Sequence, residues 1–313
     1  MNRIWCNIRN FACVLIAVLL LSCEGEVDNW KTIETHEGVL ILEGTDSVLF
    51  YQRTPTAAVG RSSRANYIHP LYGINGGVLT EDFPDDHYHH RGVFWAWHQV
   101  FVGDKRMGDA WETTNFDWNV TNVSVERKGD VSVLSANVNW ESLKWLDGLG
   151  AKWPFAKEEI KIKIHKKKDN FRVLDFNIKI EALEDSLSIG GSEDEKGYSG
   201  FSWRMKMPDD LVFNSEGGEV EPIKTEVNAG AWMNISGNLN NKGKEGIIVI
   251  SHESNPKHPQ PWILRKKKSM QNAKFPGNER YEIPKDQPLV LNYRMIIYDG
   301  DIEESVIKEM QNF

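Results

Sequence analysis

The sequence predicts an all-β protein, a large antiparallel β-sandwich, and two features of the chain point to it. Apolar and polar residues alternate with a period of two in several segments, as in strands that have one buried face and one face in water. Turn residues separate these segments, and a helical spacing of apolar residues occurs only near the C-terminus, over residues 303–310. Strands of this kind bury their apolar faces by packing as two sheets.

The clearest alternation predicts an antiparallel hairpin. Isoleucines alternate with lysines and a histidine over residues 160–165, and a second alternation covers residues 174–180. The turn sequence Lys168-Asp169-Asn170 lies between them. Weaker strand signals occupy residues 38–51, 123–139, 246–251 and 289–298.

The N-terminus has the pattern of a bacterial lipoprotein signal peptide over residues 1–22. Two arginines precede an apolar run at residues 11–21, which is too short to span a bilayer, and Leu20-Leu21-Ser22-Cys23 resembles a lipobox. We expect Cys23 to be lipidated, residues 23–33 to form a tether, and residues 34–313 to form one catalytic β-sandwich domain. The acidic residues after Cys23 indicate an outer membrane lipoprotein that faces the cell surface or the periplasm.

Composition excludes two classes of function. All three cysteines lie at positions 6, 13 and 23, so the expected domain has no disulfide and no thiolate for catalysis. Removal of the signal peptide leaves 35 basic and 45 acidic residues, a net charge of −10. Nucleic acid is therefore not an expected partner, because phosphate binding depends on Lys and Arg.

One short segment, Asp85-Asp86-His87-Tyr88-His89-His90-Arg91-Gly92, concentrates groups that exchange protons or bind metals. If it is extended, His87, His89 and Arg91 share one side, with neighbours about 6–7 Å apart. Other histidines lie in two further segments, at His69 beside Pro70 and in a proline-rich loop with His252 and His258. We expect these segments to meet in an acid–base site.

The chain has twelve tryptophans, most of which are expected in the core of the sandwich. Trp262 is the best candidate for stacking against a sugar ring, because polar residues and prolines surround it in the sequence.

Several motifs together resemble one bacterial family, which is labelled "methane oxygenase PmoA-like". The resemblance covers nearly the whole mature chain, although no segment after Cys23 is long enough to cross a bilayer as methane oxygenase subunits do. The matching motifs are Tyr67-x-His69-Pro70-Leu71, residues 84–92 followed by Phe94-Trp95-Ala96-Trp97, residues 196–201 with Arg204, and Asn255-Pro256-x-His258-Pro259-x-x-Trp262 through Arg265.

The resemblance implies a secreted domain with the supersandwich fold of galactose mutarotases, found with carbohydrate-degrading enzymes. Tyr88 departs from the family pattern and receives no role from the resemblance. With Trp262 added, the expected catalytic residues are His69, His87, His89, His90 and Tyr198, and the expected substrate-binding residues are Arg91, Arg204, His252, His258, Trp262 and Arg265.

The mechanism that the sequence favours is β-elimination, as a dehydratase or a lyase, at a uronic-acid residue of an oligosaccharide. A neutral histidine removes the proton beside the carboxylate, and another histidine or Tyr198 protonates the leaving oxygen. Arg91, Arg204 and Arg265 are the candidate clamps, because a guanidinium fork matches a carboxylate. The expected partner is thus an anionic oligosaccharide, and the membrane is contacted only through the lipid anchor.

Three alternatives remain open from the sequence. The first is a sugar mutarotase, epimerase or glycoside hydrolase of the same fold, which needs an acid and a base. For a glycoside hydrolase, Asp85 with Asp86 or Glu253 can supply the two carboxylates. No cofactor is expected, although a divalent metal at His87 and His89 is possible chemistry for a His-x-His pair. The third alternative is a surface lipoprotein that binds glycan without catalysis.

Overall fold

The computed structural model describes residues 29–57 and 63–313, so the predicted signal peptide and Cys23 lie outside the described residues. The chain is nearly all β, as the sequence predicts. Within the described residues, one sheet has eight strands, in spatial order β1 (Trp30–Glu34), β2 (Gly38–Glu43), β3 (Asp46–Gln52), β4 (Tyr67–Leu71), β5 (Val93–Trp97), β13 (Ser199–Trp203), β19 (Gln271–Lys274) and β18 (Trp262–Ile263).

The second sheet is larger and contains the longest strands. Over the same described residues it has nine strands, in spatial order β15 (Gly218–Glu219), β14 (Val212–Ser215), β16 (Trp232–Gly237), β17 (Glu245–Ser251), β21 (Leu289–Asp299), β11 (Phe171–Ala182), β10 (Ala156–His165), β9 (Val131–Glu141) and β8 (Asp117–Lys128).

A small third sheet and one short helix complete the part of the chain that is described. The sheet has four strands, in the order β20 (Tyr281–Ile283), β12 (Leu187–Gly190), β6 (Gln99–Val102) and β7 (Lys105–Gly108). The helix α1 (Glu304–Glu309) lies within the predicted helical segment. No helix among the described residues has the length and apolar character needed to cross a membrane.

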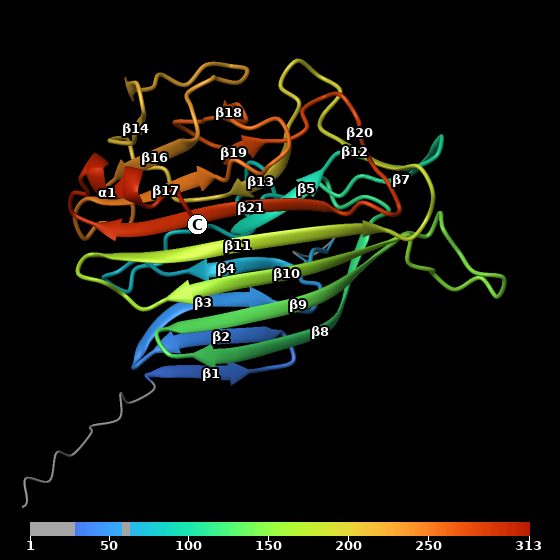
Figure 1. Cartoon of the computed structure of the whole chain (residues 1–313), viewed down its shortest axis with the longest axis horizontal. Helices are drawn as coiled ribbons and strands as arrows, with labels where there is room; N and C mark the ends of the chain where they lie inside the picture. Colours follow the sequence, from blue (N-terminus) through green and yellow to red (C-terminus); the bar gives the residue numbers. More distant parts are fainter. Residues whose placement is uncertain (1–28, 58–62) are drawn as a thin grey trace, which may run out of the picture.

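The two large sheets form the sandwich (Figure 1), with strands β8 to β11 of one sheet lying over strands β1 to β4 of the other. The predicted hairpin is confirmed as β10 and β11, which pair from Ala156 to Ile164. Along β10 buried and exposed residues alternate without exception up to Ile164. The inner isoleucines join one continuous core with residues of both sheets, and each buried side chain of this kind contributes about 1.5–3 kcal/mol.

One buried carboxylate in the core connects residues of both sheets. Glu158 of β10 is fully buried and accepts hydrogen bonds from the indole N–H groups of Trp95 and Trp140 and from the Asn66 amide. Burial raises the pKa of Glu158, while these three donors oppose the shift. The bond to Trp95 fixes which side of β5 faces the core, and it thereby fixes which side is left for the site.

The sheet begins earlier than the domain boundary expected at residue 34. Residues Trp30–Glu34 form β1 and pair with β2, and the Trp30 side chain is buried. The expected tether therefore ends in the sheet, and the apolar cores are built from residues between Trp30 and Phe313. The finer expectation, a likeness to galactose mutarotase, stays a prediction.

Candidate functional site

The candidate site lies on the outer face of β5 and β13, near the middle of the eight-stranded sheet. Trp95 and Trp97 of β5 point into the core, so Phe94 and the residue after the strand, His98, point outward. The rings of Phe94 and His98 each lie 5.3 Å from the ring of Trp111, which belongs to the loop after β7. Loops from distant parts of the sequence thus meet over this face.

The histidine-rich segment forms turns here, so the expectation of an extended strand with alternating faces is wrong. The His87 N–H donates to Pro84 O at 3.1 Å, and the His90 N–H donates to His87 O at 3.0 Å. The chain then enters β5 through Gly92, which has a φ of 49° and lies so close to Ile68 that a Cβ would come within 1.9 Å of its carbonyl oxygen. A side chain at this position would be excluded, so the turn requires glycine.

The turns bring all three imidazoles into contact, including His90, which an extended strand would point away. The rings of His87 and His90 are stacked at 4.6 Å, and the His89 ring meets them edge-on at 5.7 and 4.5 Å. His90 is buried, whereas the side chain of His87 is 40% exposed. His87 and His89 are therefore the members of the trio that a ligand can reach.

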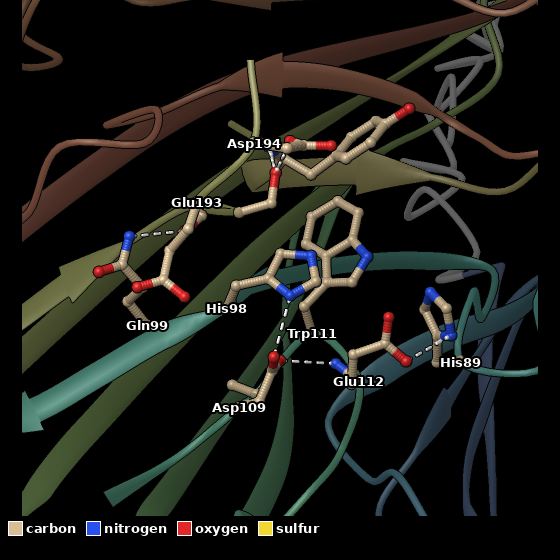
Figure 2. A network of polar contacts seen from close by, with 12 residues as sticks. His89, His98, Gln99, Asp109, Trp111, Glu112, Glu193 and Asp194 are labelled. Carbon is tan, nitrogen blue, oxygen red and sulfur yellow. Dashed lines mark hydrogen bonds and ion pairs between the residues drawn. The ribbon is translucent and has the colours of Figure 1, made fainter. Parts of the chain in front are cut away.

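A loop after β7 supplies a carboxylate that the sequence did not identify. Nδ1 of His89 lies 3.2 Å from Oε2 of Glu112, and the Glu112 N–H donates to Asp109 at 2.8 Å. Asp109 also contacts Nδ1 of His98 at 2.9 Å. Figure 2 shows these four residues as one chain of polar contacts around Trp111.

Glu112 and His89 line a polar pocket of about 350 Å³, together with Asp86, His87, Tyr88, Thr113 and Thr114. Thr113 has a φ of 58°. This left-handed conformation costs a β-branched residue on the order of 1–3 kcal/mol, and such strain concentrates at functional sites.

Burial sets the protonation states in this pocket. It lowers the pKa of His89 to about 3, and the nearby Arg64 guanidinium adds to the shift. Burial also holds the pKa of His90 well below its ordinary value and raises the pKa of Glu112. At neutral pH the site therefore pairs a neutral imidazole with a carboxyl group that keeps its proton more readily than usual.

We expect His89 to make the fold sensitive to acid. An unfolded histidine titrates near pH 6.5, whereas folded His89 takes up a proton only near pH 3, so its stabilising contribution is complete above about pH 6.5 and is lost on acidification. His89→Gln should flatten the pH dependence of the free energy of unfolding by ~1 kcal/mol per pH unit between about pH 6 and 4, measured by urea titration. His36→Gln, at an exposed turn, is the control for the substitution itself and should change the free energy of unfolding by less than about 0.5 kcal/mol. Equal slopes for His89→Gln and the unmodified chain would contradict this assignment.

Two arginines that were expected to clamp substrate are bound internally. Arg91 is 1% exposed and forms an ion pair with Asp82, with further hydrogen bonds to Thr56 and to the Tyr67 hydroxyl. Its guanidinium lies 3.5 Å above the centre of the Phe83 ring. These contacts leave Arg91 no access to a ligand.

Arg204 is likewise buried and holds the histidine-rich loop. It donates to both carboxylate oxygens of Asp86, at 2.9 and 3.0 Å, and to Glu81 at 2.7 Å. Although partial burial opposes the shift, the bonds from Arg204 and from the Ser269 N–H hold the pKa of Asp86 well below its ordinary value. Arg204 therefore positions the loop instead of binding substrate.

Tyr198 lies beside the site, and Arg265 binds it. The Tyr198 ring lies 5.7 Å from the Trp111 ring, and its hydroxyl accepts a hydrogen bond from Arg265 at 2.7 Å. Arg265 also donates to the backbone carbonyls of Ile223, Lys224 and Leu264. A second pocket, of about 340 Å³, opens next to them and is lined by Tyr198, Arg265 and the side chains of Lys196, Pro222, Ile223, Lys224, Leu264 and Lys266.

Four other expected site residues have different surroundings. His69 contacts the Thr80 hydroxyl at 3.0 Å, and burial lowers its pKa. His252 contacts Ser254 and packs against Phe313 at the C-terminus.

His258 lies in the same proline-rich loop as His252, and burial lowers its pKa as well. The expectation of a sugar-stacking surface at Trp262 is wrong, because that side chain is fully buried in β18 and its indole N–H donates to Gly230 O. Polar neighbours in the sequence do not report the burial of a strand residue.

The metal hypothesis receives no support from the arrangement of side chains. In the described part of the chain, no three His, Cys, Asp or Glu side chains are grouped so that they could hold a metal ion. His87 contacts Asp86 at 2.9 Å, and His89 contacts Glu112, so each imidazole of the His-x-His pair has its own carboxylate.

A known protein family matches most of the chain. The model of a family described as "Family of unknown function (DUF6807)" matches residues 39–312. The resemblance to a methane oxygenase PmoA-like family is therefore corrected, since the match is to a family without an assigned function. No curated protein matches the chain.

Proposed function

Since the chain belongs to the family of unknown function DUF6807, we propose from its site that it is an enzyme that transfers protons to and from a sugar. The observation that carries the proposal is the contact between His89 and Glu112 at the wall of a polar pocket. His89 stays neutral and can accept a proton, and the raised pKa of Glu112 favours the form that can donate one, so the pair holds both roles of acid–base catalysis.

The reaction that this pair supports best is mutarotation or epimerisation of a neutral sugar. In mutarotation, Glu112 donates its proton to the ring oxygen as the C1–O5 bond breaks, and His89 accepts the proton of the C1 hydroxyl. After rotation about C1–C2, His89 returns its proton to the aldehyde oxygen, the ring oxygen attacks C1, and Glu112 recovers its proton. The ring is thereby closed as the other anomer, and both residues are back in their starting states. Neither step requires a cation to hold the substrate.

The pocket lining supports a sugar as the substrate. The hydroxyl groups of Tyr88, Thr113 and Thr114 can donate hydrogen bonds to sugar hydroxyls and accept hydrogen bonds from them. A neutral sugar fits better than an anionic one, because the lining of this pocket contains two acidic residues, Asp86 and Glu112, and no Lys or Arg. The nearby Arg91 and Arg204 are already paired with carboxylates.

A second candidate is β-elimination at a uronic-acid residue, and one feature favours it. The pocket beside Tyr198 is lined by Lys196, Lys224, Arg265 and Lys266, which can attract a carboxylate. Against it, Lys224 and Lys266 already pair with Glu195 and Glu221 at 2.6 and 2.8 Å. Such an enzyme would hold the uronate carboxylate beside Tyr198 and use the acid–base pair at the neighbouring pocket.

A carbohydrate screen with two readouts separates these reactions. We expect proton NMR to show faster interconversion of anomers or epimers of at least one neutral sugar. A gain in ultraviolet absorbance from a 4,5-unsaturated uronate would favour elimination instead. The protein could instead bind a sugar without turnover in either assay, with the same affinity in the Glu112→Gln variant. That result would reject the enzyme proposal in favour of a glycan-binding protein.

A further inference from the structure

The segment between β9 and β10, residues 142–154, forms a hairpin that extends beyond the sandwich. Figure 1 shows it as the green-yellow loop at the right edge of the molecule. Its two arms are joined by the hydrogen bonds from Asp147 N to Ala151 O at 2.8 Å and from Trp153 N to Trp145 O at 3.0 Å. The Asp147 carboxylate also accepts bonds from the N–H groups of Leu149 and Ala151 at the turn.

The hairpin exposes large apolar side chains to water. Leu149 at its tip is 95% exposed, Leu143 is 65% exposed, and Leu146 and Trp153 are about half exposed. The remaining exposed large apolar residues of the described chain, Ile33, Val212 and Ile223, are scattered over other segments. Single exposed apolar residues are common, but a group of four on one ordered projection marks a contact surface.

The base of the hairpin is fixed to the body of the protein. The Ser142 hydroxyl donates to Met107 O at 2.6 Å, and the ammonium of Lys105 lies 5.5 Å from the centre of the Trp145 ring. Both contacts are to β7, the strand that precedes the Asp109 to Thr114 loop of the candidate site. The apolar tip is thus held out from the protein by a rigid support.

We propose that this hairpin inserts its tip into the surface of a lipid bilayer. The order of side chains from tip to base matches the polarity gradient of a bilayer interface, with Leu149 outermost, Trp153 behind it and Lys144 beside the arms. Lys152 is directed to the body of the protein instead, where it pairs with Asp117 at 2.9 Å. Tryptophan favours the headgroup level, and lysine extends its ammonium to lipid phosphates while its carbon stem stays in apolar surroundings.

The shape of the hairpin favours a bilayer over a protein partner. A stable protein interface buries about 800 Å² on each side, which four side chains on a convex projection do not supply. A bilayer accepts a convex tip without a matching groove. The paired backbone and the Asp147 cap also satisfy polar groups at the turn, which lowers the cost of leaving water.

Co-sedimentation with phosphatidylcholine vesicles, with and without anionic phosphatidylglycerol, tests the proposal. The chain from Glu24 to Phe313 is suitable, because it keeps both apolar cores and lacks the apolar run at residues 11–21, which would bind vesicles itself. We expect Leu146→Ser with Leu149→Ser to lower the partition coefficient tenfold or more. The matched control is Ile33→Ser, which replaces a half-exposed apolar residue of β1 and should bind as the unmodified chain does.

Two further measurements keep the result interpretable. Equal urea midpoints for the variants and the unmodified chain show that the substitutions leave the fold intact, and Lys144→Glu should weaken binding to anionic vesicles more than to neutral ones. The proposal is overturned if the unmodified chain does not sediment with either vesicle or if the double serine variant binds as strongly. A third result would also overturn it: no vesicle binding, together with self-association in the ultracentrifuge that the double serine variant removes. The hairpin would then be a contact between copies of this chain.

Discussion

Replacing Glu112 by glutamine is expected to lower kcat of the sugar reaction by ~10²–10⁴-fold. Glutamine keeps the shape and the hydrogen-bonding capacity of the side chain, so the contact with His89 and the loop conformation should persist. It cannot release a proton, and the acid step is therefore lost. Initial rates from proton NMR on the sugar found in the screen give kcat and KM for both proteins, and KM should change little.

The control is Glu193→Gln, which removes an exposed carboxylate from the same face, 3.6 Å from Arg106. It should change kcat less than about threefold, because charges in water are screened. The pH profile adds a second check: if Glu112 acts as the acid, activity falls as pH rises through its raised pKa, and this fall disappears in the variant. A variant that keeps full kcat would remove Glu112 from the mechanism.

The fold could be predicted from the sequence because its main signal is local. The period-two pattern of residues 160–180 fixes which side chains face the core, and β10 and β11 follow it. The start of the first sheet was not predictable in this way, because β1 alternates poorly and is defined by its pairing with β2 and by the burial of Trp30. The composition of a single segment does not reveal which other segment it will pair with in a sheet.

The site was predictable only in part. The cluster at His87, His89 and His90 was found because three imidazoles stand together in the sequence, whereas its turns depend on Arg204, which is distant in the chain. Glu112 has no sequence signal of its own beyond its place in a short polar loop after a strand. Its importance arises from contact with His89, which only the folded chain provides.

The two buried arginines show that residue type alone is a limited indicator of ligand binding. A guanidinium in a motif suggests recognition of an anion, but the sequence does not reveal whether the protein's own carboxylates already occupy it. Arg91 and Arg204 are paired with Asp82 and Asp86 within the described chain, and this pairing moves the proposed substrate from an anionic to a neutral sugar.

Replacing Arg91 by methionine is expected to lower the free energy of unfolding by about 3–5 kcal/mol. The substitution keeps much of the side-chain volume, but it leaves Asp82 without its cation and removes the hydrogen bond from Arg91 to the Tyr67 hydroxyl, in a largely buried region. Urea unfolding at neutral pH, followed by tryptophan fluorescence, measures the difference. A substrate clamp would behave in the opposite way, with a raised KM and an unchanged free energy of unfolding.

Two comparisons separate the loss of the ion pair from a general effect of substitution. Lys308→Met breaks an exposed pair with Glu304 one helical turn away, and it should cost less than about 0.5 kcal/mol. Adding Asp82→Asn to Arg91→Met should recover part of the loss, because an amide tolerates burial without a cation far better than a carboxylate does. If the double variant is no more stable than Arg91→Met alone, the penalty does not come from an unpaired carboxylate. The role of Arg91 would then lie in its packing against Phe83 and Tyr67.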